Sequence, residues 1–263
     1  MKKYFEILRL GWLDALEYRT EFMISIMSWG IRLFIAFFLW VAVAQTRGGE
    51  IGPYTTRSIL VYFFITQIIS SFVFSRVGFD IAYDIYRGDL ANFLLKPMNY
   101  IVFRVIHETG KNIFRTILGA VIFGTLLWLW LGGVPFALWK IPFVLLALPG
   151  AYIVNFCMVA LISLTGFWTT NSTRYSFIYF GILSIFSGMV FPVDLFPDNF
   201  AKILKLLPFQ YVFFYPAKII QSQTFSADMW SGLFIQLTYA LVFGCAVAAV
   251  YCAGLRKFEA DGR

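Results

Sequence analysis

The chain has 263 residues, of which 60% are apolar and 13% are charged, and its formal net charge is +7. In a soluble globular domain roughly a quarter of the residues are charged. This composition therefore excludes a soluble globular domain and indicates a protein that folds in a lipid bilayer. Basic loops on one side of a membrane and anionic headgroups explain the positive charge better than nucleic acid does.

The first segment, residues 1–21, predicts an amphipathic helix that lies in the membrane interface. Its charged residues mostly fall opposite an apolar face, which is the pattern of an interfacial helix with Trp12 at headgroup depth. Ile7, Leu10 and Leu13 fall among the charges, so an extension of the first membrane span stays open as an alternative. The expected apolar face comprises Tyr4, Phe5, Leu8, Trp12, Ala15 and Leu16.

Six apolar runs follow, and they predict an all-α integral membrane protein with six transmembrane helices. A helix rises 1.5 Å per residue and the hydrocarbon core is about 30 Å thick, so every run except the fifth is long enough to cross it. We expect one membrane domain over 22–255 and a tail over 256–263. The runs are 22–44, 58–79, 113–131, 141–168, 177–191 and 230–255.

The distribution of Lys and Arg predicts the orientation of the spans. With the N-terminus in the cytoplasm, the inner segments hold 14 of these residues and the outer segments hold six. The positive-inside rule therefore places both termini in the cytoplasm. The three cysteines lie in apolar runs without the spacing of metal ligands, so the sequence predicts no metal site.

Arg32 is the one ionisable residue near the middle of a run. A lone guanidinium at that depth costs about 2.5 to 3.5 kcal/mol on insertion scales, so it should face protein or a wet cavity. It either attracts an anionic group on a transported molecule or has a structural role, through a hydrogen bond to carbonyls of a neighbouring span or to Gln67.

The loop between the second and third runs predicts a short helix that docks a partner. Gly88 interrupts the helix that leaves the second span, Asp89 is a good N-cap, and Pro97 pushes Lys96 out of helical geometry. The resulting two-turn helix, within about 84–97, is too short to span a membrane and too apolar for water. It should enter a partner's groove or lie on the membrane surface.

The segment after the fifth run is apolar and broken repeatedly by proline. Irregular backbone at membrane depth survives only where it is buried in protein or faces a water-filled cavity. We expect re-entrant or interfacial helices on the outer side, over about 188–216, with a turn at Gly188 and Pro192 and a second helix between Pro197 and Pro208.

Two motifs in this order resemble the type-2 ABC exporter permeases. The first is Ile85-x-x-Gly88-x-Leu90-x-x-x-Leu94-Leu95-x-Pro97, and the second is Ser187-Gly188-x-x-x-Pro192-x-x-x-x-Pro197 with Pro208. The resemblance covers essentially the whole chain. It implies the transmembrane subunit of a transporter in the bacterial cytoplasmic (inner) membrane, which dimerises with a second copy or a paralogue.

The resemblance also implies one ATP-binding cassette subunit per half and outward movement of an amphipathic, drug-like or lipid-like molecule. The sequence has no Gly-x-x-x-x-Gly-Lys-Ser/Thr stretch, so ATP and magnesium should bind the partner subunit and not this chain. Arg32 is the expected residue of the substrate path, and Gly188, Pro192, Pro197 and Pro208 are expected to form an outer gate. The expected ATPase-docking residues are Asp84, Arg87, Gly88, Asp89, Leu90, Phe93, Leu94 and Pro97.

Other function classes have less support in the sequence. An intramembrane enzyme lacks support because the only histidine, His107, stands beside Glu108 with no second histidine to complete a metalloprotease motif. An ion-coupled secondary carrier usually has acidic residues at mid-membrane, and none falls deep in the six runs. A non-transporting membrane scaffold remains an alternative.

Overall fold

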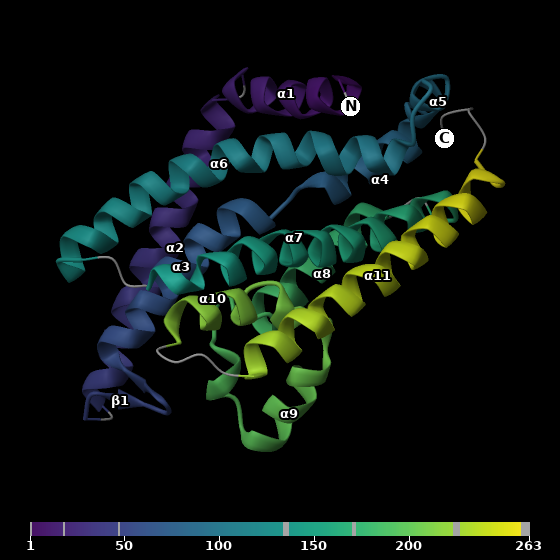
Figure 1. Cartoon of the computed structure of the whole chain (residues 1–263). Helices are drawn as coiled ribbons and strands as arrows, with labels where there is room; N and C mark the ends of the chain where they lie inside the picture. Colours follow the sequence, from purple (N-terminus) through teal and green to yellow (C-terminus); the bar gives the residue numbers. More distant parts are fainter. Residues whose placement is uncertain are drawn as a thin grey trace.

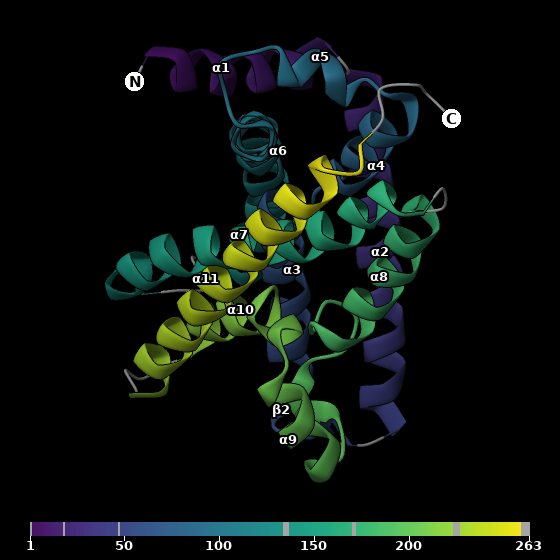
Figure 2. The same cartoon turned by 90° about the vertical axis from the view of Figure 1, so that its right-hand side faces the viewer.

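The structure is a computed structural model that describes residues 2–17, 19–46, 48–133, 137–169, 172–222 and 227–258. Its long helices form a tilted bundle (Figure 1). α1, α5 and the last turn of α11 lie at one end of the bundle, and β1 and α9 lie at the opposite end, as the perpendicular view in Figure 2 also shows. We call these the α1 end and the α9 end.

The described residues are almost entirely helical. Two short strands, β1 (Glu50–Ile51) and β2 (Tyr54–Thr55), form an antiparallel hairpin that the sequence did not predict, with Ile51 opposite Tyr54. The helices are α1 Lys2–Glu17, α2 Arg19–Thr46, α3 Thr56–Val73, α4 Val77–Arg87, α5 Leu90–Leu94, α6 Tyr100–Leu131, α7 Ile141–Leu164, α8 Ser172–Phe186, α9 Asp198–Leu206, α10 Phe214–Gln221 and α11 Ala227–Leu255, with 3-10 turns at Leu138–Lys140, Thr165–Phe167, Val193–Leu195 and Pro208–Tyr211.

Five helical stretches of the described chain are long and apolar enough to cross a membrane, and by length and composition they match five of the six predicted spans. They are Met23–Thr46, Thr56–Arg87, Tyr100–Leu131, Ile141–Phe167 and Ala227–Leu255. α8 corresponds to the fifth run but has 15 residues, about 22 Å of helix, so its crossing stays a prediction. It also ends at Phe186, not at 191, because the chain turns at Gly188, whose φ is +88°.

The bundle is built around α3 and α7. Most of the residues of these two helices are buried, whereas only a small share of the residues of α2, α6 and α11 is buried. Large apolar side chains such as Phe34, Phe38, Phe234 and Leu241 therefore cover the outside of the bundle. Such a surface requires lipid or another protein around it.

The second predicted span is interrupted in the structure. α3 ends at Val73 and α4 begins at Val77, so the run 58–79 is not one continuous helix. The backbone groups freed by this break find partners: Asn155 Nδ2 donates to the Val73 carbonyl at 2.9 Å, and Val77 N donates to Ser75 Oγ at 3.1 Å. Tyr179 OH in turn donates to Asn155 Oδ1 at 2.7 Å. These bonds let a broken helix exist at membrane depth.

α1 crosses α6 at very short range. A Cβ at Gly11 would lie 1.9 Å from the His107 carbonyl oxygen, and a Cβ at Gly110 would lie 2.2 Å from that of Leu8. The buried face of α1 is therefore Ile7, Gly11 and Ala15, whereas Tyr4 and Phe5 of the expected apolar face are exposed. Ile7, which did not fit an interfacial helix, faces protein.

Candidate functional site

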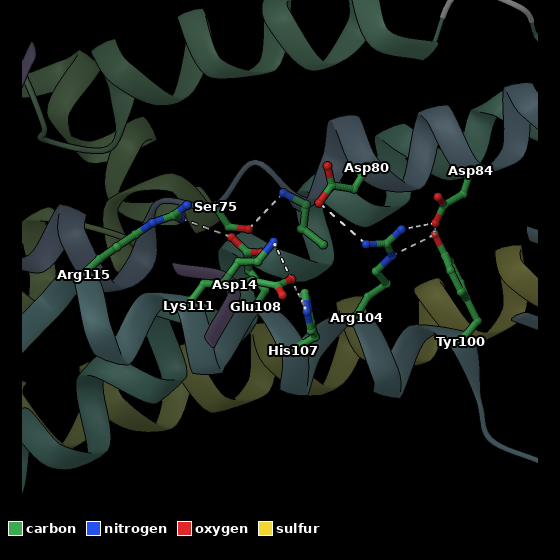
Figure 3. A network of polar contacts seen from close by, with 11 residues as sticks. Asp14, Ser75, Asp80, Asp84, Tyr100, Arg104, His107, Glu108, Lys111 and Arg115 are labelled. Atoms are coloured by element: carbon green, nitrogen blue, oxygen red, sulfur yellow. Dashed lines mark hydrogen bonds and ion pairs between the residues drawn. The ribbon is translucent and has the colours of Figure 1, made fainter. Parts of the chain in front are cut away.

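An arginine clamp joins α4 to α6 near the α1 end. The guanidinium of Arg104, on α6, pairs with Asp84 on α4, and its Nη1 lies 3.7 Å from Asp80 Oδ2. Tyr100 OH donates to the Asp84 carboxylate and accepts from Arg104 Nε at 3.2 Å. Figure 3 shows these side chains converging between the two helices. The Arg104 and Asp84 side chains are only 11% and 13% exposed, so the pair is shielded from water.

The chain turns sharply just beyond the clamp. α4 ends at Arg87, and Gly88 follows it with a φ of +79°. α5 then has only five residues instead of the expected two turns. The expected cap by the Asp89 side chain is wrong, since that residue has helical backbone geometry and its side chain makes no capping hydrogen bond. Leu90 is fully buried, and the Phe93 ring packs 5.3 Å from the Tyr100 ring. These two residues anchor α5 to the bundle.

Exposed side chains surround this turn. Tyr83 and Tyr86 are about half exposed, Leu94 is 45% exposed and Leu95 is 86% exposed. Arg87 lies over the Tyr83 ring, 5.3 Å from its centroid. We call Tyr83, Tyr86, Arg87, Leu94 and Leu95 the corner surface. Asp89, Lys96 and Pro97 are exposed beside it, and Lys3 of α1 donates to the Pro97 carbonyl.

A second polar group joins α1 to α6 next to the clamp (Figure 3). His107 Nε2 lies 2.9 Å from Asp14 Oδ2, and Lys111 Nζ lies 3.9 Å from the same oxygen. One turn further along α6, Arg115 lies 3.5 Å from the carboxylate of Glu108, which is buried. His107 thus takes part in the packing of α1 on α6, whereas Glu108 forms an ion pair within α6.

Arg32 lies in α2 and lines a cavity of about 160 Å³ with Thr66, Gln67 and Trp40. Its Nε donates to the Ser28 carbonyl of the same helix at 3.3 Å. Gln67 instead donates to Ser70 Oγ at 3.0 Å. The two residues share the cavity, but the described contacts contain no bond between them.

The expected gate residues lie around α9, away from the corner surface. Tyr62 OH donates to the Gly188 carbonyl, and Phe214 N donates to the Ser187 carbonyl at 2.9 Å. Pro197 precedes α9 directly, while Pro192 and Pro208 border 3-10 turns. α9 buries Ala201 and Leu204, whereas Phe200 and Ile203, which were expected to face inward, are 39% and 56% exposed.

The sequence matches a model of a known protein family. A family model described as ABC-2 family transporter protein matches residues 31–262, which covers most of α2 and every later helix. The chain belongs to the ABC-2 transporter family. The predicted resemblance is thereby confirmed. No curated protein is similar enough to the chain to count as a match.

Membership of the ABC-2 family makes this chain a multi-pass membrane protein and a permease that lacks ATPase activity of its own. Permeases of this family generally pair with ATP-binding subunits. The structure brings the expected docking residues of this ABC-2 permease together at one corner, and it places Arg32 and the gate residues elsewhere.

The sequence did not single out Arg104, Tyr100 and Asp80, which hold that corner in place. Arg104 counted only as a basic residue of an inner segment. Its partner Asp84 lies 20 residues earlier on another helix, so no helical spacing signals the pair.

Proposed function

We propose that this chain is the membrane-spanning permease subunit of an ATP-driven exporter, and that the corner surface docks a separate ATP-binding subunit. The observation that carries the proposal is the exposure of Leu94 and Leu95 on a turn that is otherwise firmly anchored. In an interface, buried apolar anchors at the centre contribute most of the binding energy. Arg87 and Asp89 supply charges for the rim, while Asp84 and Leu90 hold the turn from inside.

The anchoring of the turn also suggests how force reaches the membrane domain. The clamp ties α4 to α6, and α6 runs unbroken for 32 residues, about 48 Å at 1.5 Å per residue. A push on α5 would therefore move α6 as a rod toward the α9 end. α1, which is packed backbone to backbone on α6, would move with it.

The remaining features support a path for an amphipathic, drug-like or lipid-like molecule. In this proposal a second permease copy or paralogue covers the apolar outer face of α2. Arg32, in its cavity beside that face, meets an anionic group of the substrate. The turn at Gly188 and the segment from Pro192 through Pro197 to Pro208 close the path at the α9 end.

The proposal includes the orientation of the bundle in the membrane. The α1 end lies in the cytoplasm of a bacterial cell, with both chain termini, and the α9 end lies outside the inner membrane. The positive-inside bias of the sequence supports this arrangement. α1 then lies at the cytoplasmic interface, with Tyr4 and Phe5 toward lipid.

The test of docking is co-purification of the ATP-binding subunit with a Leu94→Asp, Leu95→Asp double variant. Each change puts a charge at the centre of the proposed interface, and neither side chain is buried in this chain. Phe93 is left intact because it packs on Tyr100. We expect the partner to be lost while the permease itself is produced and inserted at normal levels.

The matched control is Leu206→Asp, which introduces the same charge at a 76% exposed leucine of α9, at the opposite end. It should leave co-purification unchanged. Retention of the ATP-binding subunit by the double variant at the wild-type ratio would reject the docking role.

A further inference from the structure

A deep apolar groove opens on the side of the bundle between α6 and α7. Its volume is about 430 Å³, and its floor is formed by α3 and by Ile220 of α10. Its lining includes Ile65 and Ile69 on the floor, Gly124 and Trp128 on one wall and Leu145 on the other. Trp128 and Leu145 are more than half exposed, so the groove opens to the outside of the bundle between them.

The length of the groove matches one leaflet of a bilayer. Its wall on α6 runs from Thr116 to Trp128, about 18 Å of helix at 1.5 Å per residue. Half of a hydrocarbon core of about 30 Å is about 15 Å. An acyl chain that follows α6 would therefore fill the groove from the middle of the membrane to one surface.

At the α9 end a separate polar pocket of about 580 Å³ lies next to the groove. Neighbouring residues line the two cavities. On α10, Ile220 lines the groove and Gln221 and Ser222 line the pocket; on α6, Leu127 of the groove and Leu131 of the pocket lie one turn apart. The pocket also carries the Arg57 guanidinium, the Lys218 ammonium and the Ser58 hydroxyl. Apolar walls thus give way to hydrogen-bond donors at the depth where an acyl chain gives way to its headgroup.

The charge at this end is unbalanced in favour of an anion. The one carboxylate lining the pocket, Asp194, is already paired with Lys218 and lies 3.6 Å from Lys205. Arg57 has no carboxylate partner within the described part of the chain, and its Nη2 reaches the Leu131 carbonyl at 3.5 Å. Lys140 adds a buried ammonium nearby, bonded to the Ile220 carbonyl at 2.7 Å.

We propose that the groove and the pocket together bind one anionic glycerophospholipid of the surrounding bilayer. One acyl chain lies between α6 and α7, and the phosphodiester accepts from Arg57 at the α9 end. Cations near a membrane surface attract anionic lipid by about 1 kcal/mol each, so charge selects the headgroup while the apolar groove holds the chain. This site is distinct from the corner surface and does not depend on ATP.

Native mass spectrometry of the full-length chain, released from mixed micelles, tests the proposal. The probes are dioleoyl-phosphatidylglycerol and dioleoyl-phosphatidylcholine, which differ in headgroup charge and share acyl chains. We expect the first to bind at least fivefold more tightly, and Arg57→Gln to reduce this preference about fivefold, the equivalent of one cation.

A second variant tests the groove by filling it. A Cβ at Gly124 meets no atom within 4 Å, so Gly124→Leu can occupy the groove without a clash and should weaken both lipids. The matched control is Gly244→Leu on α11, where a Cβ is equally unobstructed. That change should leave both affinities unchanged.

Three results would overturn the proposal. Equal binding of the two lipids would show that the polar pocket does not select an anionic headgroup. Unchanged lipid binding in Gly124→Leu would show that the groove does not hold the acyl chain. A Gly124→Leu variant that binds lipid normally but fails to self-associate would show that a second copy of this chain covers the groove. Since no ATP-binding subunit takes part, none of these results bears on the docking proposal.

Discussion

The buried arginine clamp predicts how much stability the chain loses when Arg104 is replaced. In Arg104→Gln the guanidinium is removed, and the Asp84 carboxylate stays buried without its charged partner. Removal of one member of a buried ion pair costs about 3–5 kcal/mol, because the remaining charge has lost both its water and its counterion. For a chain of this size 1 kcal/mol corresponds to roughly 2–4 °C, so we expect the unfolding midpoint to fall by about 6–20 °C.

The chain offers a matched surface pair for comparison. Arg9 lies 3.7 Å from Glu6 on α1, but both side chains are about 60% exposed. Exposed pairs contribute about 0–1 kcal/mol, so Arg9→Gln should shift the midpoint by no more than about 4 °C. Both variants are measured by thermal unfolding of the purified chain in one detergent.

A double variant separates the pair from other effects of the substitution. In Arg104→Gln combined with Asp84→Asn the unpaired charge is gone, so the midpoint should recover part of the loss. The reasoning is refuted if Arg104→Gln is as mild as Arg9→Gln, or if the two losses simply add.

Three further predictions concern other parts of the chain. Gly11→Ala should separate α1 from α6 and destabilise by about 1–3 kcal/mol, whereas Gly30→Ala, where a Cβ meets nothing, should be neutral or slightly stabilising in thermal unfolding. Arg32→Gln should reduce export at normal protein levels, and unchanged transport would remove Arg32 from the path. Asp198→Cys, in a chain with its native cysteines replaced, should react with an impermeant thiol reagent from outside, and labelling only from the cytoplasm would invert the topology.

The sequence was sufficient for the family and for most of the spans, because both depend on local patterns. Apolar runs of about 20 residues indicate membrane spans without any knowledge of the rest of the chain. Gly88 and Gly188 each follow the end of a helix and have a positive φ in the structure, as the motifs predicted. The prolines after the fifth run likewise border short helices. Such features need no knowledge of distant residues.

The parts that sequence reasoning missed depend on contacts between distant segments. The break after Val73 is tolerated because Asn155, 82 residues later, bonds its carbonyl. The start of α6 at Tyr100, and not at 113, places Arg104, His107 and Lys111 on a helix whose charges have partners on α4 and α1. Without those partners a charged segment resembles a loop.

The sequence also does not predict which face of a short helix is buried. α5 was expected to present Leu90 and Leu94 to a partner, but the turn at Gly88 buries Leu90 and exposes Leu94. One turn of helix has no periodicity that would choose between these faces. The same holds for α9, where Leu204 is buried and Ile203 is exposed.

Photo-crosslinking from position 95 tests the central claim most directly. Leu95 is 86% exposed at the tip of the corner surface, so a benzophenone side chain there reaches any docked partner without disturbing this chain. In membranes that contain the whole transporter, we predict a covalent adduct with the ATP-binding subunit from position 95 and none from position 206 on α9. An adduct from position 206 but not from position 95 would contradict the account.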